Sequence, residues 1–262
     1  MLLKDKVIIV SGIGPGLGVK LAVEAAREGA RALVIGARTA EKLEDAERRI
    51  GEVAPGCQVL KVTTDITDDA QCKRLADQAA SRFGRIDALI NSGFAYGEYG
   101  PFETTNLDGW KVALETNILG GLRLTQAVVP HMKKSGGGAV VMINTQSSVV
   151  TTLGEGCYAT SKGGLTTAAR YLARELGAYN IRVNNIRMGW MWGVPVQQAL
   201  VRLAESAGQT IEEFTAPIKA QIALGRMPTD DECARAALFL VSDYASAVTG
   251  ATLDANGGQF MA

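Results

Sequence analysis

The amino-acid sequence predicts an α/β protein with a doubly wound parallel sheet of seven strands. Short runs of β-branched residues alternate with longer stretches of helical periodicity along the whole chain. This alternation is typical of the right-handed β-α-β units that build a parallel sheet. No repeat, low-complexity segment or linker-like stretch interrupts it. A chain of 262 residues can also bury a hydrophobic core without disulfide bonds or metal ions to hold it together. We therefore expect one domain over residues 1–262.

The seven candidate strands are residues 7–10, 32–35, 58–62, 88–90, 140–143, 182–186 and 251–253. Helical patterns separate them and are clearest at residues 18–28, 40–52, 68–82 and 163–176. Ligands of open α/β sheets bind at loops beyond the carboxyl ends of the strands. Two such loops are residues 93–101 and 189–195, and a further helical pattern covers residues 199–221. We expect a substrate loop or lid at about residues 189–221.

The composition excludes several classes of protein. The 27 basic and 27 acidic residues give a formal net charge of zero, which leaves no basic surface of the kind that binds nucleic acid. No apolar stretch approaches ~18 residues, so no membrane span is predicted, and the first residues do not resemble a signal peptide. The four cysteines form no Cys-x-x-Cys motif, which favours reduced thiols and a cytoplasmic location.

The single histidine, His131, excludes a multi-histidine metal site, and we expect no metal. A serine-histidine-acid triad would also need this residue, and the sequence holds no Gly-x-Ser-x-Gly elbow. His131 lies beside Pro130 near the end of a helical pattern, so we expect it to be a surface or capping residue.

A glycine-rich loop follows the first candidate strand. Gly12, Gly16 and Gly18 separate this strand from a helical pattern. A backbone that turns sharply there and approaches a pyrophosphate closely requires glycine, and the amides at the helix N-terminus would bind the anion. The spacing is Gly-x-x-x-Gly-x-Gly, so a simple tight turn is the alternative, but the position after the first strand favours a dinucleotide phosphate loop. The residues expected to line it are Gly12, Gly14, Gly16, Leu17 and Gly18.

The end of the second candidate strand indicates which dinucleotide the loop accepts. An acidic residue there would bind the ribose 2′-hydroxyl of NAD and repel a 2′-phosphate. The sequence instead has Ala37 followed by Arg38, and an arginine suits a 2′-phosphate. We therefore predict NADP(H) as the preferred cofactor. NAD(H) is the alternative if Arg38 is only a solvated loop residue.

Tyr158 and Lys162 are four residues apart in a helical pattern, which places them on one face of the helix. A nearby ammonium group favours the phenolate and lowers the tyrosine pKa from its usual ~10, so the phenol could exchange a proton near neutral pH. Taken alone, the pair could be a half-buried aromatic residue and a solvated lysine. Together with a dinucleotide loop, it predicts hydride transfer coupled to proton transfer at an alcohol or ketone carbon.

Six features, in the same order, resemble the short-chain dehydrogenase/reductase family, and the resemblance covers essentially the whole chain. They are the Gly12/Gly16/Gly18 loop, Asp65 next to Ile66, Asn91-Ser92-Gly93, Asn117, the Tyr158/Lys162 pair and the closing segment 249–258. The resemblance implies that Asp65 contacts the adenine, and that Ile66, Asn91 and Gly93 also belong to the cofactor site. It further implies a Rossmann-type fold and a homo-oligomer, either a tetramer or a dimer.

Two positions depart from the family pattern. The catalytic serine of the family usually stands thirteen residues before the tyrosine, and that position is Thr145 here. Thr145 carries the same hydroxyl and can still donate to a substrate oxygen, while Ser147 is the alternative if the loop is two residues shorter. The second departure is Met188-Gly189, where the family commonly has Pro-Gly. That loop normally faces the nicotinamide through backbone groups, so Gly189 and Met191 stay expected cofactor contacts.

The resemblance implies an enzyme that interconverts a ketone and a secondary alcohol. Tyr158 would be the proton donor in reduction and the base in oxidation, Lys162 would lower its pKa and hold the ribose hydroxyls, and Thr145 would hydrogen-bond the carbonyl oxygen. Asn117 would fix a water that relays protons to Lys162. Apolar residues of the strand-end loops favour a cyclic or aromatic substrate: Phe94, Tyr96, Trp190 and Trp192. The alternatives are an enoyl-thioester reductase, which in related enzymes has a wider tyrosine-to-lysine spacing, and a non-catalytic NADP-binding regulator, which would not need the pair.

Overall fold

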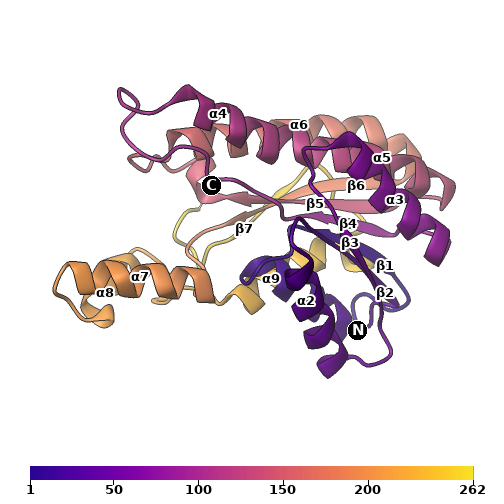
Figure 1. The fold of residues 1–262 in the computed structure, drawn as a ribbon, viewed down its shortest axis with the longest axis horizontal. Helices are drawn as coiled ribbons and strands as arrows, with labels where there is room; N and C mark the ends of the chain where they lie inside the picture. Colours follow the sequence, from indigo (N-terminus) through magenta and orange to yellow (C-terminus); the bar gives the residue numbers. More distant parts are fainter. Residues whose placement is uncertain (262) are drawn as a thin grey trace.

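Seven parallel strands form one sheet in the order β3-β2-β1-β4-β5-β6-β7 (Figure 1). The computed structural model describes residues 1–261. The strands are β1 Val7–Ser11, β2 Ala32–Ala37, β3 Gln58–Thr63, β4 Ala88–Asn91, β5 Gly138–Thr145, β6 Ile181–Met188 and β7 Thr252–Ala255. Every neighbouring pair runs parallel. The predicted seven-stranded, doubly wound Rossmann-type sheet is confirmed, and the chain folds as one domain.

Helices cover both faces of this sheet. They are α1 Leu17–Arg27, α2 Ala40–Val53, α3 Asp69–Phe83, α4 Leu107–Leu114, α5 Gly121–Lys134, α6 Gly156–Leu176, α7 Val194–Ser206, α8 Ile211–Ala220 and α9 Asp230–Val241. One face packs against α1, α2 and α9, and the other packs against α3, α5 and α6 (Figure 1). The parallel sheet is thus buried on both sides, as its apolar strands require.

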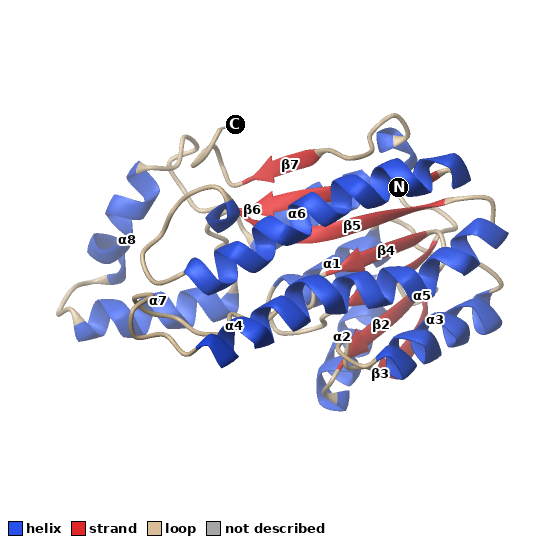
Figure 2. Cartoon of the chain, turned by 90° about the horizontal axis from the view of Figure 1, so that it is seen from above, coloured by secondary structure: helices blue, strands red, loops and turns tan. Residues whose placement is uncertain are grey.

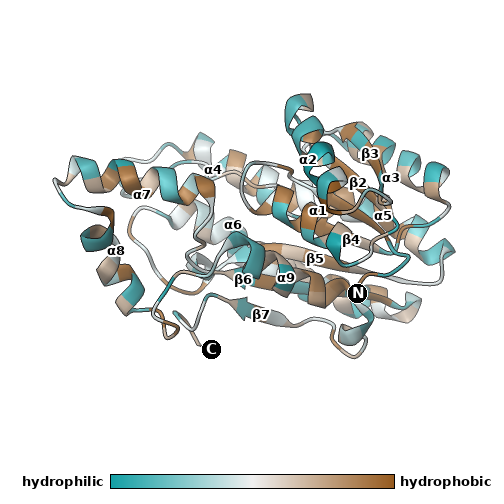
Figure 3. Cartoon of the chain, turned by 90° about the horizontal axis from the view of Figure 1, so that it is seen from below, coloured by the Kyte–Doolittle hydropathy of each residue, from teal (hydrophilic) through white to brown (hydrophobic). Residues whose placement is uncertain are grey.

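The strands divide their side chains between two cores because successive residues point to opposite faces. In β1, Ile8 and Val10 join the core beneath α1 and α9, whereas Val7 and Ile9 join the core beneath α3, α5 and α6. Figure 3 shows the hydrophobic colour gathered along the strands and a largely hydrophilic surface on α2. These two cores hold the carboxyl ends of the strands, and therefore the candidate site, in fixed positions.

The segment after β6 forms two helices that project from the body of the fold (Figure 2). The single helical pattern expected at residues 199–221 is broken here, because Gly208 adopts a φ of +67° and Thr210 begins α8 with a capping box. A small core of Leu200, Ile222 and Met227 joins the two helices. Trp192 is partly buried and packs against this core. None of the helices described in residues 1–261 is long and apolar enough to span a membrane.

Candidate active site

The candidate residues lie beyond the carboxyl ends of β1, β4, β5 and β6. The strand order reverses between β1 and β4, because the chain builds β2 and β3 on one side of β1 and β5 to β7 beyond β4. Open α/β sheets bind nucleotides in the crevice at such a reversal. The loops after β1 and β4 therefore meet where a dinucleotide would lie.

Two glycines of the loop after β1 are required by close backbone packing. Gly12 has a φ of +80°, and a Cβ there would lie 2.3 Å from the backbone nitrogen of Gly93. A Cβ on Gly18 would lie 2.2 Å from the carbonyl oxygen of Gly12. No larger residue fits at either position unless backbone moves. The two glycines thus hold the loop against the end of β4.

Gly14 and Gly16, in contrast, border open space. A Cβ on Gly14 would meet nothing within 4 Å, and one on Gly16 would meet only the Pro195 ring, at 3.4 Å. Gly16 is the N-cap of α1 and offers no side chain to cap the helix that Leu17 begins. The first amides of α1 therefore have room for an external anion. This cradle fits the pyrophosphate of a dinucleotide.

The end of β2 is where the ribose of the adenosine half would lie. Ala37 is buried, and Arg38 is exposed. Within residues 1–261, the Arg38 guanidinium has no ion pair or side-chain hydrogen bond. It is therefore available to an anionic group of a ligand.

Asp65 and Ile66 follow β3 at the same edge. Asp65 closes a tight turn, because its Oδ1 accepts from the Thr67 nitrogen at 2.9 Å and from the Thr67 hydroxyl at 2.8 Å. Ile66 packs against two glycines: its Cδ1 would lie 2.8 Å from a Cβ on Gly93, and its Cγ1 would lie 2.8 Å from one on Gly120. The turn leaves Oδ2 of Asp65 without a protein partner among the described residues.

The Asn91 side chain points into the protein. Asn91 is 5% exposed, and its Nδ2 donates to the Thr125 hydroxyl at 3.1 Å and to the Gly121 carbonyl at 3.4 Å. The Ser11 hydroxyl donates to its Oδ1 at 3.4 Å. These bonds tie β4 to β1 and to the start of α5. A contribution of Asn91 to the cofactor site would therefore come from its backbone and from the position it gives to Gly93.

Lys162 lies one turn after Tyr158 in α6, beneath the site. Lys162 is 2% exposed, and its Nζ donates to the Ile143 carbonyl at 2.8 Å. The same Nζ lies 5.9 Å from the centroid of the Tyr158 ring. Burial lowers the pKa of Lys162 to about 7. The lysine is therefore only partly protonated at neutral pH.

The pKa of Tyr158 is raised well above its ordinary value, and the expected lowering is absent from the chain alone. Burial is the main cause, and the neighbouring Tyr96 and Glu155 act in the same direction. The nearby Thr145 hydroxyl acts in the opposite direction but is the smallest of these effects. The prediction that the lysine lowers this pKa was wrong here, because desolvation weakens the lysine charge and penalises the phenolate.

Thr145, rather than Ser147, is the hydroxyl that acts on the phenol. Thr145 ends β5, and a single 3₁₀ turn, Gln146–Ser148, follows. Its Oγ1 accepts from the Ser147 nitrogen at 3.3 Å and lies 3.3 Å from the Ser147 hydroxyl. Thr145, and not Ser147, also lowers the pKa of the Tyr158 phenol. The loop therefore presents the threonine hydroxyl toward the tyrosine, which favours Thr145 over Ser147 as the substrate-facing group.

Asn117 stands in a π-helical turn, Glu115–Gly120, between α4 and α5. It is 2% exposed, its Oδ1 accepts from the Ala95 nitrogen at 2.7 Å, and its Nδ2 donates to the Ala95 carbonyl at 2.8 Å. The same Nδ2 donates to the Ser161 hydroxyl at 2.8 Å. Both amide protons are therefore used, and Asn117 joins the loop after β4 to α6.

Aromatic residues border the phenol. The Tyr96 ring lies 5.1 Å from the Tyr158 ring and 5.1 Å from the Phe94 ring, measured between centroids. Phe94 and Tyr96 are about half exposed, at 49% and 59%. Glu155, which sequence reasoning missed, is the N-cap of α6, and its Oε2 is buried without a partner. Its position three residues before Tyr158, on the same helical face, is the signal that could have identified it.

The loop after β6 completes the edge. A Cβ on Gly189 would lie 2.7 Å from Cβ of Asn256 and 2.8 Å from Oε1 of Gln146, so this glycine is required by packing. Met191 is partly buried and packs against the core beneath α1 and α9. Both residues thus fix the course of the loop, and Gly189 can offer only its backbone groups to a nicotinamide.

A phosphate cradle and a hydroxyl-tyrosine-lysine group on one edge of a doubly wound sheet define an NAD(P)-dependent oxidoreductase. Comparison with known proteins agrees. The family model described as "Enoyl-(Acyl carrier protein) reductase" matches residues 12–259. The chain belongs to the short-chain dehydrogenase/reductase family.

The chain is similar over its whole length to several relatives. It is 30% identical to levodione reductase of Leifsonia aquatica over 256 residues, covering 97% of this chain and 94% of the relative. It is 32% identical to 7alpha-hydroxysteroid dehydrogenase of Escherichia coli over 258 residues, covering 98% and 94%. The structure of L-sorbose reductase from Gluconobacter frateurii, solved with NADPH and L-sorbose, aligns with a TM-score of 0.93 at 26% identity, covering 100% of this chain and 99% of that one.

Proposed function

We propose that this enzyme reduces a ketone to a secondary alcohol and catalyses the reverse oxidation. Three observations at one edge of the sheet carry the proposal: the Thr145 hydroxyl lowers the pKa of the Tyr158 phenol, Lys162 is buried one turn further along α6, and the glycine cradle is open. Two hydroxyl groups there can point at one substrate oxygen. This is the arrangement that protonation of a carbonyl oxygen needs.

Each residue has a distinct part in the proposed reaction. A nicotinamide cofactor, when bound, supplies or accepts the hydride. Tyr158 donates its phenolic proton to the carbonyl oxygen as charge develops there, and Thr145 donates a second hydrogen bond to the same oxygen. Lys162, in its protonated form, favours the resulting phenolate. Both amide protons of Asn117 are used, so a water that relays protons to Lys162 would have to donate to Oδ1 of Asn117 or bind the backbone of the π-helical turn.

The cofactor we propose is NADP(H). The cradle formed by Gly14 and Gly16 accepts the pyrophosphate of either dinucleotide, so the preference depends on the end of β2. Ala37 offers no carboxylate to the ribose, and the exposed Arg38 guanidinium is free to pair with a 2′-phosphate. Structures of relatives contain either type of cofactor: one holds NADH and another NADPH.

The proposed substrate is an apolar cyclic or aromatic ketone. The half-exposed rings of Phe94 and Tyr96 stand next to the phenol, where a flat apolar molecule could stack. Among the relatives, 7alpha-hydroxysteroid dehydrogenase was solved with 7-oxo glycochenodeoxycholic acid. Projecting α7 and α8 would close over such a substrate as a lid.

The second candidate function is reduction of an enoyl thioester, which the description of the matching family model names. The four-residue spacing from Tyr158 to Lys162 disfavours it. We also propose a homo-oligomer, tetramer or dimer, in a reducing cytoplasm. In support of that location, all four cysteines are free thiols, and burial raises the pKa of Cys57 and Cys72 to about 11.

The test is turnover of a panel of cyclic, aromatic and sugar ketones, and of a 2-enoyl thioester, with NADPH and NADH. We expect oxidation of NADPH by at least one apolar ketone, and a loss of ~10²–10⁴-fold in kcat with Tyr158→Phe. Turnover confined to the enoyl thioester would establish the second function. Tight NADPH binding with no turnover on any compound would leave the chain a cofactor-binding regulator.

A further inference from the structure

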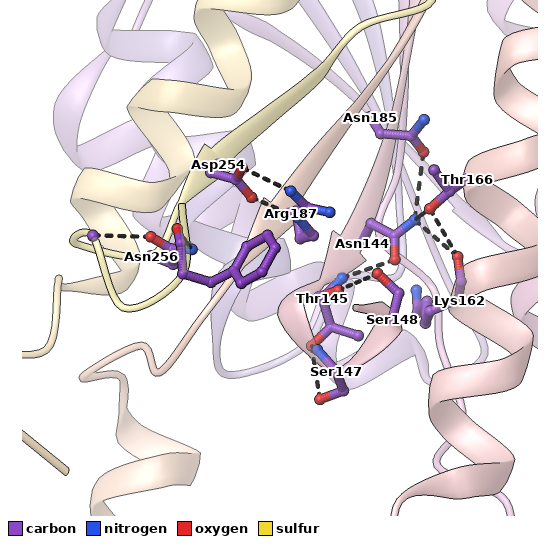
Figure 4. A network of polar contacts seen from close by, with 12 residues as sticks. Asn144, Thr145, Ser147, Ser148, Lys162, Thr166, Asn185, Arg187, Asp254 and Asn256 are labelled. Atoms are coloured by element: carbon purple, nitrogen blue, oxygen red, sulfur yellow. Dashed lines mark hydrogen bonds and ion pairs between the residues drawn. The ribbon is translucent and has the colours of Figure 1, made fainter. Parts of the chain in front are cut away.

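A buried amide network joins the end of β5 to α6 beneath the candidate catalytic groups (Figure 4). Its centre is Asn144, which is 2% exposed and stands immediately before Thr145. Oδ1 of Asn144 accepts from the Thr145 nitrogen at 2.8 Å. Its Nδ2 donates to the Thr166 hydroxyl at 2.7 Å and to the Lys162 carbonyl at 3.0 Å. The acceptor of the side chain is thus used on the strand and its two shorter donor bonds on the helix, with a third, longer contact to Oδ1 of Asn185 on β6 at 3.5 Å.

The bonds between strand and helix run in both directions. Lys162 sends its side chain to the backbone of the strand, where Nζ bonds the Ile143 carbonyl at 2.8 Å. Asn144 sends its side chain to the backbone of the helix, at the carbonyl of the same lysine. The Thr166 hydroxyl, which accepts from Asn144, donates to that carbonyl at 3.1 Å. Two reciprocal crossings fix both the separation of β5 from α6 and their relative position along the helix axis.

This network governs the two groups that act on the substrate oxygen. Thr145 is the next residue after Asn144, and the Ser148 hydroxyl holds its carbonyl at 2.7 Å. Tyr158 is one helical turn before Lys162 in α6. The Thr145 and Tyr158 hydroxyls come from different elements, so their separation depends on how those elements are joined. Asn144 is the only residue in residues 1–261 whose side chain bonds both the Thr145 backbone and the Lys162 backbone.

We propose that Asn144 is a positioning residue that sets the distance between the Thr145 hydroxyl and the Tyr158 phenol. The proposal rests on the function proposed above, in which both groups bond the substrate oxygen. Asn144 itself touches no reacting atom. It acts by holding the last residue of β5 against one turn of α6, so that the two donors converge before substrate arrives.

The test compares Asn144→Ala with a matched control, Asn184→Ala. Asn184 is fully buried on β6 and makes the same kinds of bonds, donating to the Val248 carbonyl at 2.8 Å and accepting from the Ala251 nitrogen at 3.0 Å. We expect both variants to lose thermal stability. Only Asn144→Ala should lose kcat, by about 10²-fold, which a displacement of about 1 Å can cause. Its KM for ketone and its Kd for NADPH should stay within about threefold. Equal kcat losses in the two variants, or an unchanged kcat in Asn144→Ala, would overturn the proposal.

Two further measurements keep the proposal testable. If Asn144→Ala does not fold, Thr166→Val removes the nearest anchor of the amide at constant volume, and it should lower kcat with little change in KM. If the wild-type enzyme reduces no ketone, the proposed function fails, and crystal structures then decide the geometry. Thr145 and Tyr158 must move apart in the Asn144 variant and not in Asn184→Ala; identical positions would refute the role.

Discussion

Lys162 couples the charge of the candidate site to the stability of the fold. It is buried beneath β5 with one backbone acceptor, the Ile143 carbonyl, and no carboxylate partner among the described residues. Burial without a counter-charge disfavours the ammonium form and lowers its pKa to about 7 from an ordinary 10.5. The folded protein therefore releases a proton here at a pH where the unfolded chain keeps it.

Stability should accordingly rise with pH between about pH 7 and pH 10, because the unfolded chain binds more protons at Lys162 over that range. Below pH 7 both states are protonated there, and the contribution is constant. In Lys162→Met this rise should be absent. Between about pH 7 and pH 10, the free energy of unfolding of wild type should therefore increase by a few kcal/mol relative to that of the variant. Urea unfolding at several pH values measures it. Parallel curves for the two proteins would show that Lys162 is charged in the folded state.

Thr145 and Ser147 carry the two hydroxyls that follow β5, and each can be removed separately. Thr145→Val deletes the hydroxyl at nearly constant volume, and Ser147→Ala is the matched deletion two residues on. We expect Thr145→Val to lose ~10²–10³-fold in kcat, as for a lost oxyanion donor, because the Thr145 hydroxyl is the one that acts on the phenol. Ser147→Ala should change kcat little. The reverse order would place Ser147 at the substrate oxygen.

Arg38 decides the cofactor in our proposal. Arg38→Ala should weaken NADPH binding by about ten- to a hundredfold, as for loss of one charge-assisted hydrogen bond, while NADH binding hardly changes. Ala37→Asp should move the preference further toward NADH, because a carboxylate there accepts from the ribose hydroxyl and repels the phosphate. The ratio of kcat/KM for the two cofactors measures both. A wild-type ratio in favour of NADH would make Arg38 an ordinary surface residue.

The loop between β1 and α1 contains one glycine that packing requires and one that faces open space. We expect substitution of the first to lower stability and substitution of the second to weaken cofactor binding. Gly12 is held by a positive φ and by backbone 2.3 Å from where a Cβ would lie, whereas Gly14 faces open space. Gly12→Ala should therefore lower the free energy of unfolding by more than about 1 kcal/mol. Gly14→Val should leave the free energy of unfolding within about 0.5 kcal/mol of wild type. It should weaken the binding of NADPH, which a fluorescence titration measures. Unchanged NADPH affinity in Gly14→Val would remove Gly14 from the cofactor site.

The elements differ in how far the sequence predicts them. β1, β2 and β4 are continuous apolar runs, and their positions follow from that pattern. β5 and β6 are each eight residues long and extend beyond residues 140–143 and 182–186. Their added residues include Asn144 and Arg187, polar side chains that are buried only because α6 and β7 supply partners. A pattern of hydrophobicity cannot identify such positions, because the partners lie far away in the sequence.

For the whole chain, the order of the motifs predicted which loops meet at one edge of the sheet. The burial and the pKa values of the residues in those loops depend on tertiary packing. The glycine loop, Thr145 and the Tyr158/Lys162 pair lie at one edge of the sheet because parallel strands align their carboxyl ends. The raised pKa of Tyr158 and the packing of Trp192 against the small core of α7 and α8 could not be predicted, since both depend on surrounding elements. The same holds for Asn144, whose neighbours in α6 are eighteen and twenty-two residues away.

The bond pair between Asn117 and Ala95 has a consequence for how such an enzyme can diversify. Asn117 grips the backbone of Ala95, not the side chains of Phe94 or Tyr96 on either side of it, and it also holds α6 through Ser161. The two aromatic side chains therefore take no part in the hydrogen bonds that hold the main chain of this loop. Mutation can exchange them for residues of other size or polarity without releasing the hydrogen bonds through which Asn117 joins this loop to α6.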